Sequence, residues 1–242
     1  MKIMLDIGNT RTKFVIKQNG LTQPIQTIDN NKLTTTWLNG NWQKATHILI
    51  ANVNQPILTE ELELWAKEKV ITLKNIKSES ARFGITNCYE QPNTLGVDRW
   101  LTLIGAGCDF PKKNVLIIDS GTATTIDYLT SDGKHQGGWI LPGIVTLFES
   151  IIARATHVDA KYISSPSISL GRNTSECVNS ACWAATIGLI EVTIANIRQN
   201  NTIDDVILLG GNANALKTLL SEPVIIEQNL MFSGLQQYFS EE

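Results

Sequence analysis

The feature that most constrains the fold is a pattern of apolar run, acidic turn and apolar run that occurs twice. Residues 2–17 read KIMLDIGNTRTKFVIK, and residues 114–129 read NVLIIDSGTATTIDYL. In each segment an acid, Asp6 or Asp119, is followed two positions later by glycine. Each copy predicts a strand, a tight polar turn and a second strand. The copies lie roughly half a chain apart, which indicates a duplicated architecture.

The segments between and after these copies predict alternating helices and strands. Continuous apolar runs predict buried strands, and longer amphipathic or capped segments predict helices. The expected strands are 46–53, 71–73 and 206–209, and the expected helices are 59–69, with Thr59 as its cap, 96–107 and 176–199. A strand, strand, helix, strand order that occurs twice predicts an α/β protein with two similar lobes and a cleft between them. A polar turn at Phe110-Pro111-Lys112 suggests lobes 1–110 and 111–242.

Composition excludes several classes of protein. The chain has 242 residues, 43% of them hydrophobic, which suits a packed core. A net charge of −3 predicts neither a nucleic-acid partner nor binding to an anionic membrane. No uninterrupted apolar run is long enough to span a bilayer, and the N-terminus does not resemble a signal peptide. Four cysteines without metal-site spacing predict reduced thiols, and we therefore expect a cytoplasmic protein.

Both turns have the residue types of a phosphate site. Glycine lets the backbone turn closely, and successive N–H groups with a threonine hydroxyl can face an anion. In the first turn Arg11 and Lys13 could balance polyphosphate charge, and an acid at the end of the strand could hold a hydrated Mg²⁺. The simpler interpretation of a single copy is a β-hairpin with a polar tip. Two copies that face a common cleft favour the phosphate site.

Three further motifs allow both a structural and a functional interpretation. Gly210-Gly211 follows a strand and is either a strand-to-helix turn or a close approach to a planar base. In Gly96-Val97-Asp98-Arg99, an acid and a cation begin an apolar helix, as either a cap with a surface ion pair or a general base with an anion clamp. Residues 137–143 (GGWILPG) are either an ordinary loop or backbone pressed against a ligand or another lobe.

Two features of the second half concern the long helix. Asn173-Thr174 precedes it and is either a capping pair or a contact to a ligand hydroxyl. Within the helix, small residues form one face: Ala181, Ala184, Ala185 and Gly188. This face fits either packing within the chain or a dimer interface.

Taken in order, these motifs resemble those of type III pantothenate kinases. The matching strings are DIGNTRTK, GVDR, DSGT, GGWILPG and the Asn-Thr pair, and they cover nearly the whole chain. Residues 19–43 and 155–169 carry no signature. The resemblance implies the actin-like ATPase fold of the acetate and sugar kinase/Hsc70/actin superfamily, with two duplicated ribonuclease-H-like lobes. It also implies phosphorylation of the pantothenate 4′-hydroxyl by ATP, the first step of coenzyme A biosynthesis. Mg²⁺, a monovalent cation (K⁺ or NH₄⁺) and a homodimer are implied as well.

The resemblance assigns roles by position. It implies that Asp98 is the catalytic proton acceptor and that Asp119 is the ligand of the monovalent cation. The residues implied to bind ATP are Asp6, Ile7, Gly8, Asn9, Thr10, Arg11, Thr12, Lys13 and Thr122. The residues implied to bind pantothenate are Tyr89, Gly96, Val97, Asp98, Arg99 and Thr174.

Three alternative functions compete with this one. A different kinase or phosphatase of the superfamily, such as a sugar kinase, would not need GVDR together with GGWILPG. An accessory protein like the Bvg accessory factor group could have lost the reaction, but Asp6, Lys13, Asp98 and Asp119 are all present. A protein that only binds a nucleotide would need no general base, so Asp98 favours the kinase.

Overall fold

The computed structural model describes residues 1–52, 55–155 and 157–241, and the chain forms two compact units. Unit 1 contains residues 1–109 together with 229–242, and unit 2 contains residues 110–228. The sequence-based boundary near residue 110 agrees with this division. The assignment of residues 229–242 needs correction. The sequence analysis placed them in the second lobe, but they belong to unit 1.

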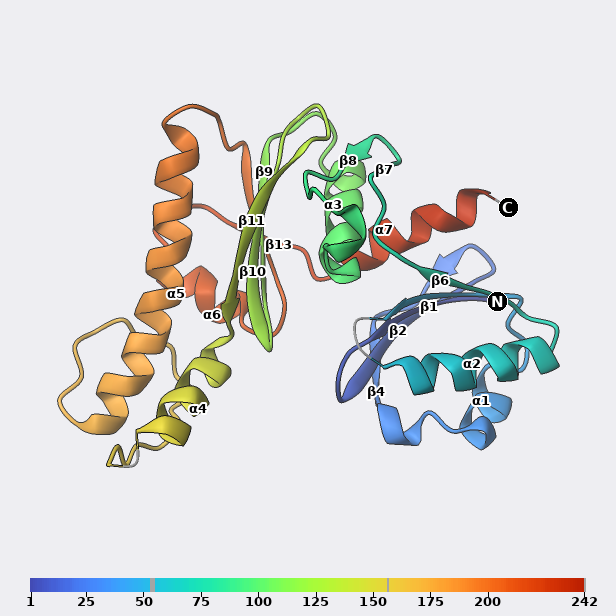
Figure 1. Cartoon of the computed structure of the whole chain (residues 1–242), viewed down its shortest axis with the longest axis horizontal. Coiled ribbons are helices and arrows are strands. Elements are labelled where there is room, and N and C mark those ends of the chain that lie inside the picture. The colour runs from blue at the N-terminus through green and yellow to red at the C-terminus, as the bar shows by residue number, and fades with distance from the viewer. Residues whose placement is uncertain (53–54, 156, 242) are drawn as a thin grey trace. The chain divides into compact units, whose positions relative to one another are not determined.

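Unit 1 is built on a mixed sheet of the order β3-β2-β1-β5-β6, with β4 also paired to β2. Figure 1 shows α1 and α2 on one side of this sheet and the α3–α7 pair apart from them. The strands are β1 (Lys2–Ile7), β2 (Arg11–Gln18), β3 (Leu21–Thr22), β4 (Gln26–Asp29), β5 (His47–Asn52), β6 (Thr72–Ile76), β7 (Ala81–Arg82) and β8 (Ile85–Thr86). The helices are η1 (Asn30–Lys32), α1 (Thr35–Asn41), α2 (Pro56–Glu68), η2 (Pro92–Thr94), α3 (Val97–Asp109), α7 (Leu230–Gln237) and η3 (Tyr238–Glu241).

Unit 2 is built on a sheet of the order β11-β10-β9-β12-β13. Its strands are β9 (Val115–Ser120), β10 (Ala123–Leu129), β11 (His135–Pro142), β12 (Asp205–Leu209) and β13 (Ile225–Ile226). Its helices are α4 (Ile144–Arg154), α5 (Thr174–Arg198) and α6 (Ala213–Leu219). The long helix α5 is capped by Asn173, whose Oδ1 accepts the Glu176 N–H, and Glu176 Oε2 accepts the N–H of Arg172, the residue before the cap.

The two sheets confirm the duplication that the sequence predicted. In each, the first strand pairs antiparallel with the second and parallel with the strand after the next helix. Asp6 and Asp119 therefore occupy equivalent places near the carboxyl end of the central strand. In α/β sheets, ligands commonly bind at the carboxyl ends of the strands.

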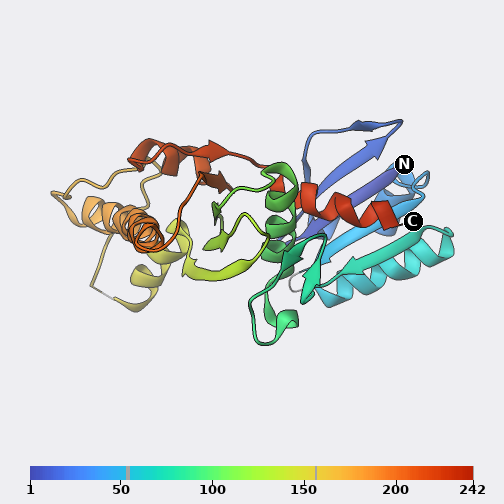
Figure 2. The same cartoon turned by 90° about the horizontal axis from the view of Figure 1, so that it is seen from above.

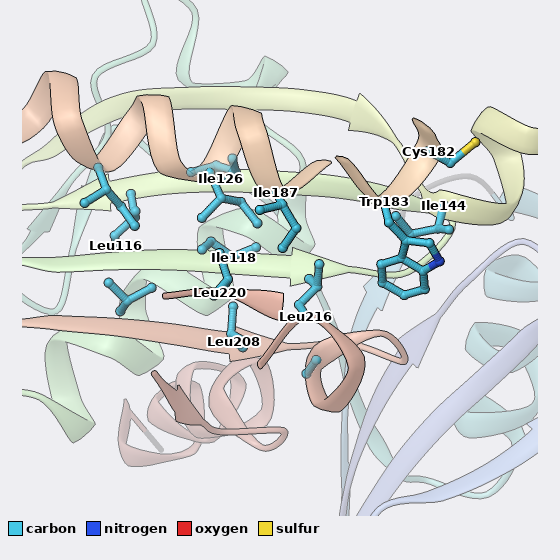
Figure 3. Close-up of a cluster of buried hydrophobic side chains, with 14 of the residues drawn as sticks. Leu116, Ile118, Ile126, Ile144, Cys182, Trp183, Ile187, Leu208, Leu216 and Leu220 are labelled. Carbon is cyan, nitrogen blue, oxygen red and sulfur yellow. The ribbon is translucent and has the colours of Figure 1, made fainter. Parts of the chain in front are cut away.

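Each unit buries its own core between sheet and helices. In unit 2 alternate residues of β9, Leu116 and Ile118, point toward α5, as expected for the two-residue repeat of a strand. Figure 3 shows them with Ile187 of α5 and Leu216 of α6 in one apolar cluster. In unit 1 the corresponding cluster joins Ile3, Leu5 and Ile7 of β1 to α1 and α2.

The C-terminal helix α7 packs on α3 at unusually short range. A Cβ at Gly105 of α3 would collide with the Leu230 carbonyl, and a Cβ at Gly234 of α7 would collide with the Leu101 carbonyl. Two glycines therefore allow the helix backbones to touch. This contact joins segments more than a hundred residues apart, and Figure 2 shows the two helices side by side.

Three local expectations need correction or qualification. Helix α2 begins at Pro56, so Thr59 is not its cap; the Thr59 hydroxyl instead donates to the Gln55 carbonyl at 3.1 Å. The expected strand at 46–53 is β5, and residue 53 lies outside the described residues. Residues 137–142 form most of β11 instead of a loop, because pairing with β10 overrides their glycine content.

Among the described residues, α5 is long and apolar enough to cross a membrane by length and composition alone. Its buried side chains, Trp183, Ile187 and Ile190 among them, belong to the core of unit 2. A core helix therefore accounts for this apolar segment.

Candidate active site

The first turn is a tight hairpin that aligns an acid with a cation. The Gly8 N–H donates to the Arg11 carbonyl at 3.0 Å, which closes the turn between β1 and β2. The resulting register sets Asp6 directly opposite Lys13. Asp6 is partly buried, whereas Lys13 is exposed. The hairpin thus places the Asp6 carboxyl group next to an exposed turn that carries the positive charges of Arg11 and Lys13.

Two polar side chains outside the motif hold this turn in place. Asn30 Nδ2 donates to the carbonyls of Gly8 at 2.9 Å and Asn9 at 3.3 Å, and Gln55 Nε2 donates to the Asn9 carbonyl at 3.0 Å. The Thr12 hydroxyl donates to Asn30 Oδ1 at 2.8 Å. The turn carbonyls are therefore fixed from one side. Asn30 lies in a segment without any signature, so sequence reasoning missed it, and Gln55 was missed as well.

Not every side chain of the motif is available to a ligand. Ile7 is fully buried in the core of unit 1, and Thr12 is buried with its hydroxyl bonded to Asn30. Arg11 pairs with Asp29 of β4, Nε to Oδ1 at 3.2 Å, although its side chain is 68% exposed. Ile7 and Thr12 thus have only backbone groups to offer a ligand.

Asp6 has an unusual titration for a carboxyl group. Burial raises its pKa to about 6; the Lys13 charge opposes this shift, and the negative charge of Asp98 adds to it. Asp98 is therefore within electrostatic reach of Asp6. The acid of the first turn and the proposed base converge in unit 1, although more than ninety residues separate them in sequence.

Asp98 lies in the first turn of α3, as the sequence predicted. Its Oδ1 accepts the N–H of Arg99 at 2.8 Å, and a Cβ at Gly96 would crowd this same oxygen. The Thr102 hydroxyl donates to the Asp98 carbonyl at 2.7 Å. The carboxylate is thus held over the N-terminus of α3.

Arg99 and Tyr89 form one unit beside Asp98. Arg99 is only 5% exposed, and its Nη1 donates to the Tyr89 hydroxyl at 2.8 Å. The guanidinium carbon also lies 5.7 Å from the centre of the Tyr89 ring. Val97 is buried. The structure thus brings Tyr89 to the Gly96–Arg99 motif, as the sequence analysis expected.

The second turn is closed by neighbouring backbone. The Gly121 N–H donates to the Ala123 carbonyl at 2.9 Å, and the Thr122 carbonyl accepts from the Gly143 N–H and the Thr146 hydroxyl, each at 2.9 Å. A Cβ at Gly143 would collide with the carbonyls of Gly121 and Thr122. The last glycine of GGWILPG is therefore required for close packing on this turn.

Asp119 lies against the glycine pair that follows β12. Gly210 has φ of +86°, and a Cβ there would collide with Asp119 Oδ1 and the Ser120 carbonyl. Gln228 holds Gly210 through two bonds of 3.1 Å, accepting its N–H and donating to its carbonyl. Asn212 donates through its N–H to the Ser120 carbonyl at 3.1 Å. Sequence reasoning found Gly210 and Asp119 but not their contact.

Thr174 belongs to unit 2, as the exposed first residue of α5. Its neighbour Asn173 is the helix cap, which confirms the structural interpretation for Asn173. The other expected pantothenate contacts, Tyr89 and Gly96–Arg99, belong to unit 1.

The chemistry of the donor groups fits the expected cations. Among the described residues no cluster of three or more His, Cys, Asp or Glu side chains could hold a metal ion. Mg²⁺ at phosphoryl-transfer sites commonly keeps several waters and uses one or two carboxylates with substrate phosphates. Asp6 meets this requirement, because a cation would stabilise its ionised form. Asp119 has a carboxylate oxygen close to Gly210, at a position where any Cβ would collide with it.

Comparison with known proteins identifies relatives over the full length of the chain. The model of the family described as type III pantothenate kinase matches residues 2–196. A type III pantothenate kinase of Colwellia psychrerythraea is 42% identical, covering 98% of this chain and all of the relative. A solved structure described as a Baf family transcriptional activator from Campylobacter jejuni superposes with a TM-score of 0.64 at 19% identity and covers 99% of this chain and 98% of its own. One described as a 2-dehydro-3-deoxygalactonokinase from Sinorhizobium meliloti has a TM-score of 0.61 at 13% identity, covering 98% and 97%. At such identities the two structures show the fold alone, and it is the actin-like ATPase fold that the sequence predicted.

Proposed function

The chain belongs to the type III pantothenate kinase family, and from this premise we propose how its residues perform the phosphorylation of pantothenate. The reaction transfers the γ-phosphoryl group of ATP to the 4′-hydroxyl of pantothenate and serves coenzyme A biosynthesis. The observation that carries the assignment of residues is that the charge of Asp98 contributes to the raised pKa of Asp6, so the two carboxyl groups lie within electrostatic reach of each other. It supports a single reaction centre in which a phosphate turn and a base act on the same phosphoryl group.

Asp98 is the proton acceptor. Phosphoryl transfer proceeds through a loose transition state, so the protein mainly positions the groups and neutralises charge. Asp98 accepts the proton of the 4′-hydroxyl as the oxygen–phosphorus bond forms. Gly96, Val97, Arg99 and Tyr89 contact pantothenate around it, and the bond from Arg99 to the Tyr89 hydroxyl supports a shared role for these two residues.

Residues 6–13 bind the phosphates of ATP. Lys13 is exposed at the hairpin and supplies positive charge, and the backbone of Gly8, Asn9 and Thr10 supplies the closely turned chain. Asp6 holds Mg²⁺, which neutralises phosphate charge when it is bound. Thr122 in the second turn contacts ATP as well.

Asp119 is the ligand of a monovalent cation. Its carboxylate provides the hard oxygen donor that K⁺ or NH₄⁺ requires, and the second turn contains no lysine or arginine in residues 119–125. A bound cation therefore adds positive charge that this turn lacks. We expect Asp119→Ala to abolish the response of the rate to added potassium, and an unchanged response would move the cation site elsewhere.

We further propose a cytoplasmic homodimer. Support comes from the exposed small side chains of α5, Ala181, Ala184 and Ala185, which leave a helix face open to close approach. In such a dimer Thr174, at the start of the same helix, contributes to the pantothenate site.

The direct test is ATP consumption by the purified protein with Mg²⁺, with and without pantothenate, in potassium and then in sodium buffer. We expect turnover that requires pantothenate and rises with potassium. Turnover without pantothenate would indicate a nucleotide hydrolase. No turnover in either buffer would favour the accessory-protein alternative.

A further inference from the structure

One buried hydroxyl connects the two segments that carry the pantothenate contacts of unit 1. Tyr238 follows α7 near the C-terminus and is only 2% exposed. Its hydroxyl accepts the Nε1–H of Trp100 at 3.1 Å and donates to Glu79 Oε1 at 2.7 Å. Burial and the bond to Glu79 raise the pKa of Tyr238, so the hydroxyl keeps its proton and remains a donor.

The hydrogen bond from Trp100 connects Tyr238 to the helix that carries Asp98. Trp100 is fully buried in the first turns of α3, two residues after Asp98. The backbone N–H of Trp100 donates to the Gly96 carbonyl at 2.9 Å, at the point where the Gly96–Arg99 motif enters the helix. A bond at the Trp100 indole therefore fixes the start of α3 relative to the C-terminal segment.

The Glu79 side leads to Tyr89. Residues 79–92 fold into a closed loop around the buried amide of Asn87, whose Nδ2 donates to the carbonyls of Glu79 at 3.2 Å and Pro92 at 3.1 Å. Asn87 Oδ1 accepts the N–H of Tyr89 at 3.0 Å. The position of Glu79 is thus transmitted through one side chain to the backbone of Tyr89.

We propose that Tyr238 is a positioning residue for the pantothenate site, because its hydroxyl holds the helix of Asp98 and the loop of Tyr89 in one register. This inference rests on the proposed roles of Asp98 and Tyr89. The register sets the distance between the base and the phenol that contact the same substrate. Catalytic sites lose efficiency when such distances change by about 1 Å.

The ring of Tyr238 has contacts that do not involve its hydroxyl. It packs edge-on against Phe83 with ring centres 5.0 Å apart, and Lys74 Nζ lies 5.3 Å from its centre. Tyr238→Phe keeps these ring contacts and removes only the two hydrogen bonds of the hydroxyl, to Trp100 and to Glu79. The variant therefore separates positioning from packing.

The test measures both Michaelis constants of Tyr238→Phe. We expect the KM for pantothenate to rise about 5- to 10-fold, because the loss of the two hydrogen bonds of Tyr238 loosens the positions of Asp98 and Tyr89, and the KM for ATP to change less than about twofold. Calorimetric titration with pantothenate, in the presence of a non-hydrolysable ATP analogue, should give the same weakening. An unchanged KM for pantothenate, or an equal rise in both constants, would overturn the proposal.

Unit 2 offers a matched control in Tyr128→Phe. Tyr128 is likewise buried, and its hydroxyl donates to the Thr202 carbonyl at 2.8 Å. We expect this variant to leave both Michaelis constants unchanged. If it weakens pantothenate as much as Tyr238→Phe does, the effect belongs to any lost buried hydroxyl and the positioning role is rejected.

A second variant approaches the junction from its other side. Glu79→Ala should reproduce the pantothenate defect, and the double variant with Tyr238→Phe should be no worse than either single one, because both break the same link. Additive defects would contradict a shared link. Wild-type turnover that requires pantothenate tests the proposed function separately, so the two hypotheses fail in different experiments.

Discussion

The two turns share one backbone plan and differ in what surrounds it. In the first, a partly buried Asp6 faces Lys13 across the hairpin, and its pKa is raised by burial and by Asp98. In the second, Asp119 faces Thr125, and neighbouring backbone closes the turn through Gly143. Duplication thus preserved the strand order while the charges diverged. The first turn thus sets a carboxyl group of raised pKa opposite a lysine, whereas the second turn is closed by tightly packed backbone.

The largest effect that tests this division concerns the base. Asp98→Asn should lower kcat about 10²- to 10⁴-fold, because the amide cannot take the hydroxyl proton. The amide oxygen can still accept the Arg99 N–H, so pantothenate and ATP should bind with nearly unchanged affinity, measured by calorimetry. Near-normal turnover would show that Asp98 is not the general base. The proposed difference in charge between the two units would then be rejected as well.

The next effect concerns Gly210, whose backbone packs against Asp119 and Ser120 at the second turn. Gly210→Ala should destabilise the protein by about 2–4 kcal/mol, because φ is positive there and the added methyl meets Asp119 and Ser120. Gly8→Ala in the first turn should cost only about 1 kcal/mol, since its Cβ would lie 3.1 Å from the Arg11 carbonyl without a positive φ.

Thermal unfolding compares these two variants. Gly211→Ala is the control, because a Cβ there would meet nothing within 4 Å. Equal losses for Gly8→Ala and Gly210→Ala would mean that the backbone around the two turns is packed equally tightly and that the comparison is wrong.

The last effect is a gain in stability, and it is smaller than the loss expected for Gly210→Ala. The pKa of Asp6 in the folded protein, about 6, exceeds the usual value near 3.8. As the pH rises, the unfolded chain therefore loses this proton at a lower pH than the folded protein does. Stability is therefore lost as pH rises from about 4 to 6 and stays lower above that range. Asp6→Asn should raise the stability by about 1–2 kcal/mol at pH 7.5, a few degrees in Tm, while impairing turnover.

The dependence on pH distinguishes this explanation from a general packing effect. The gain in Tm for Asp6→Asn should vanish near pH 4, where the wild-type carboxyl is also neutral. A gain of equal size at both pH values, or a loss at pH 7.5, would contradict an Asp6 whose pKa is raised by burial.

Much of this arrangement could be predicted from the sequence, because it depends on local patterns. The apolar runs before Asp6 and Asp119 and the helix that begins at the GVDR motif each carry their own periodicity or cap. Of the two interpretations of residues 137–143, the ordinary loop was wrong, because tertiary pairing decides the structure there. Residues 137–142 have the composition of a loop but form a strand beside β10.

The partners of the site residues could not be predicted for the same reason. Asn30 and Gln55 brace the first turn from distant positions, and single polar residues carry no periodic signal. The return of α7 to unit 1 depends on glycines at 105 and 234, whose complementarity appears only when the helices meet. The roles of the individual site residues remain predictions for the experiments above.

The division of the chain also sets an order of events during synthesis. Unit 2 is one continuous segment, whereas unit 1 is interrupted and needs residues 229–242 to cover α3. A ribosome that makes the chain from its N-terminus has synthesised all of unit 2 before it makes the last helix of unit 1. The half that carries Asp98 is therefore completed last, and a nascent chain that stops short of residue 229 leaves the buried face of α3 exposed to chaperones and proteases.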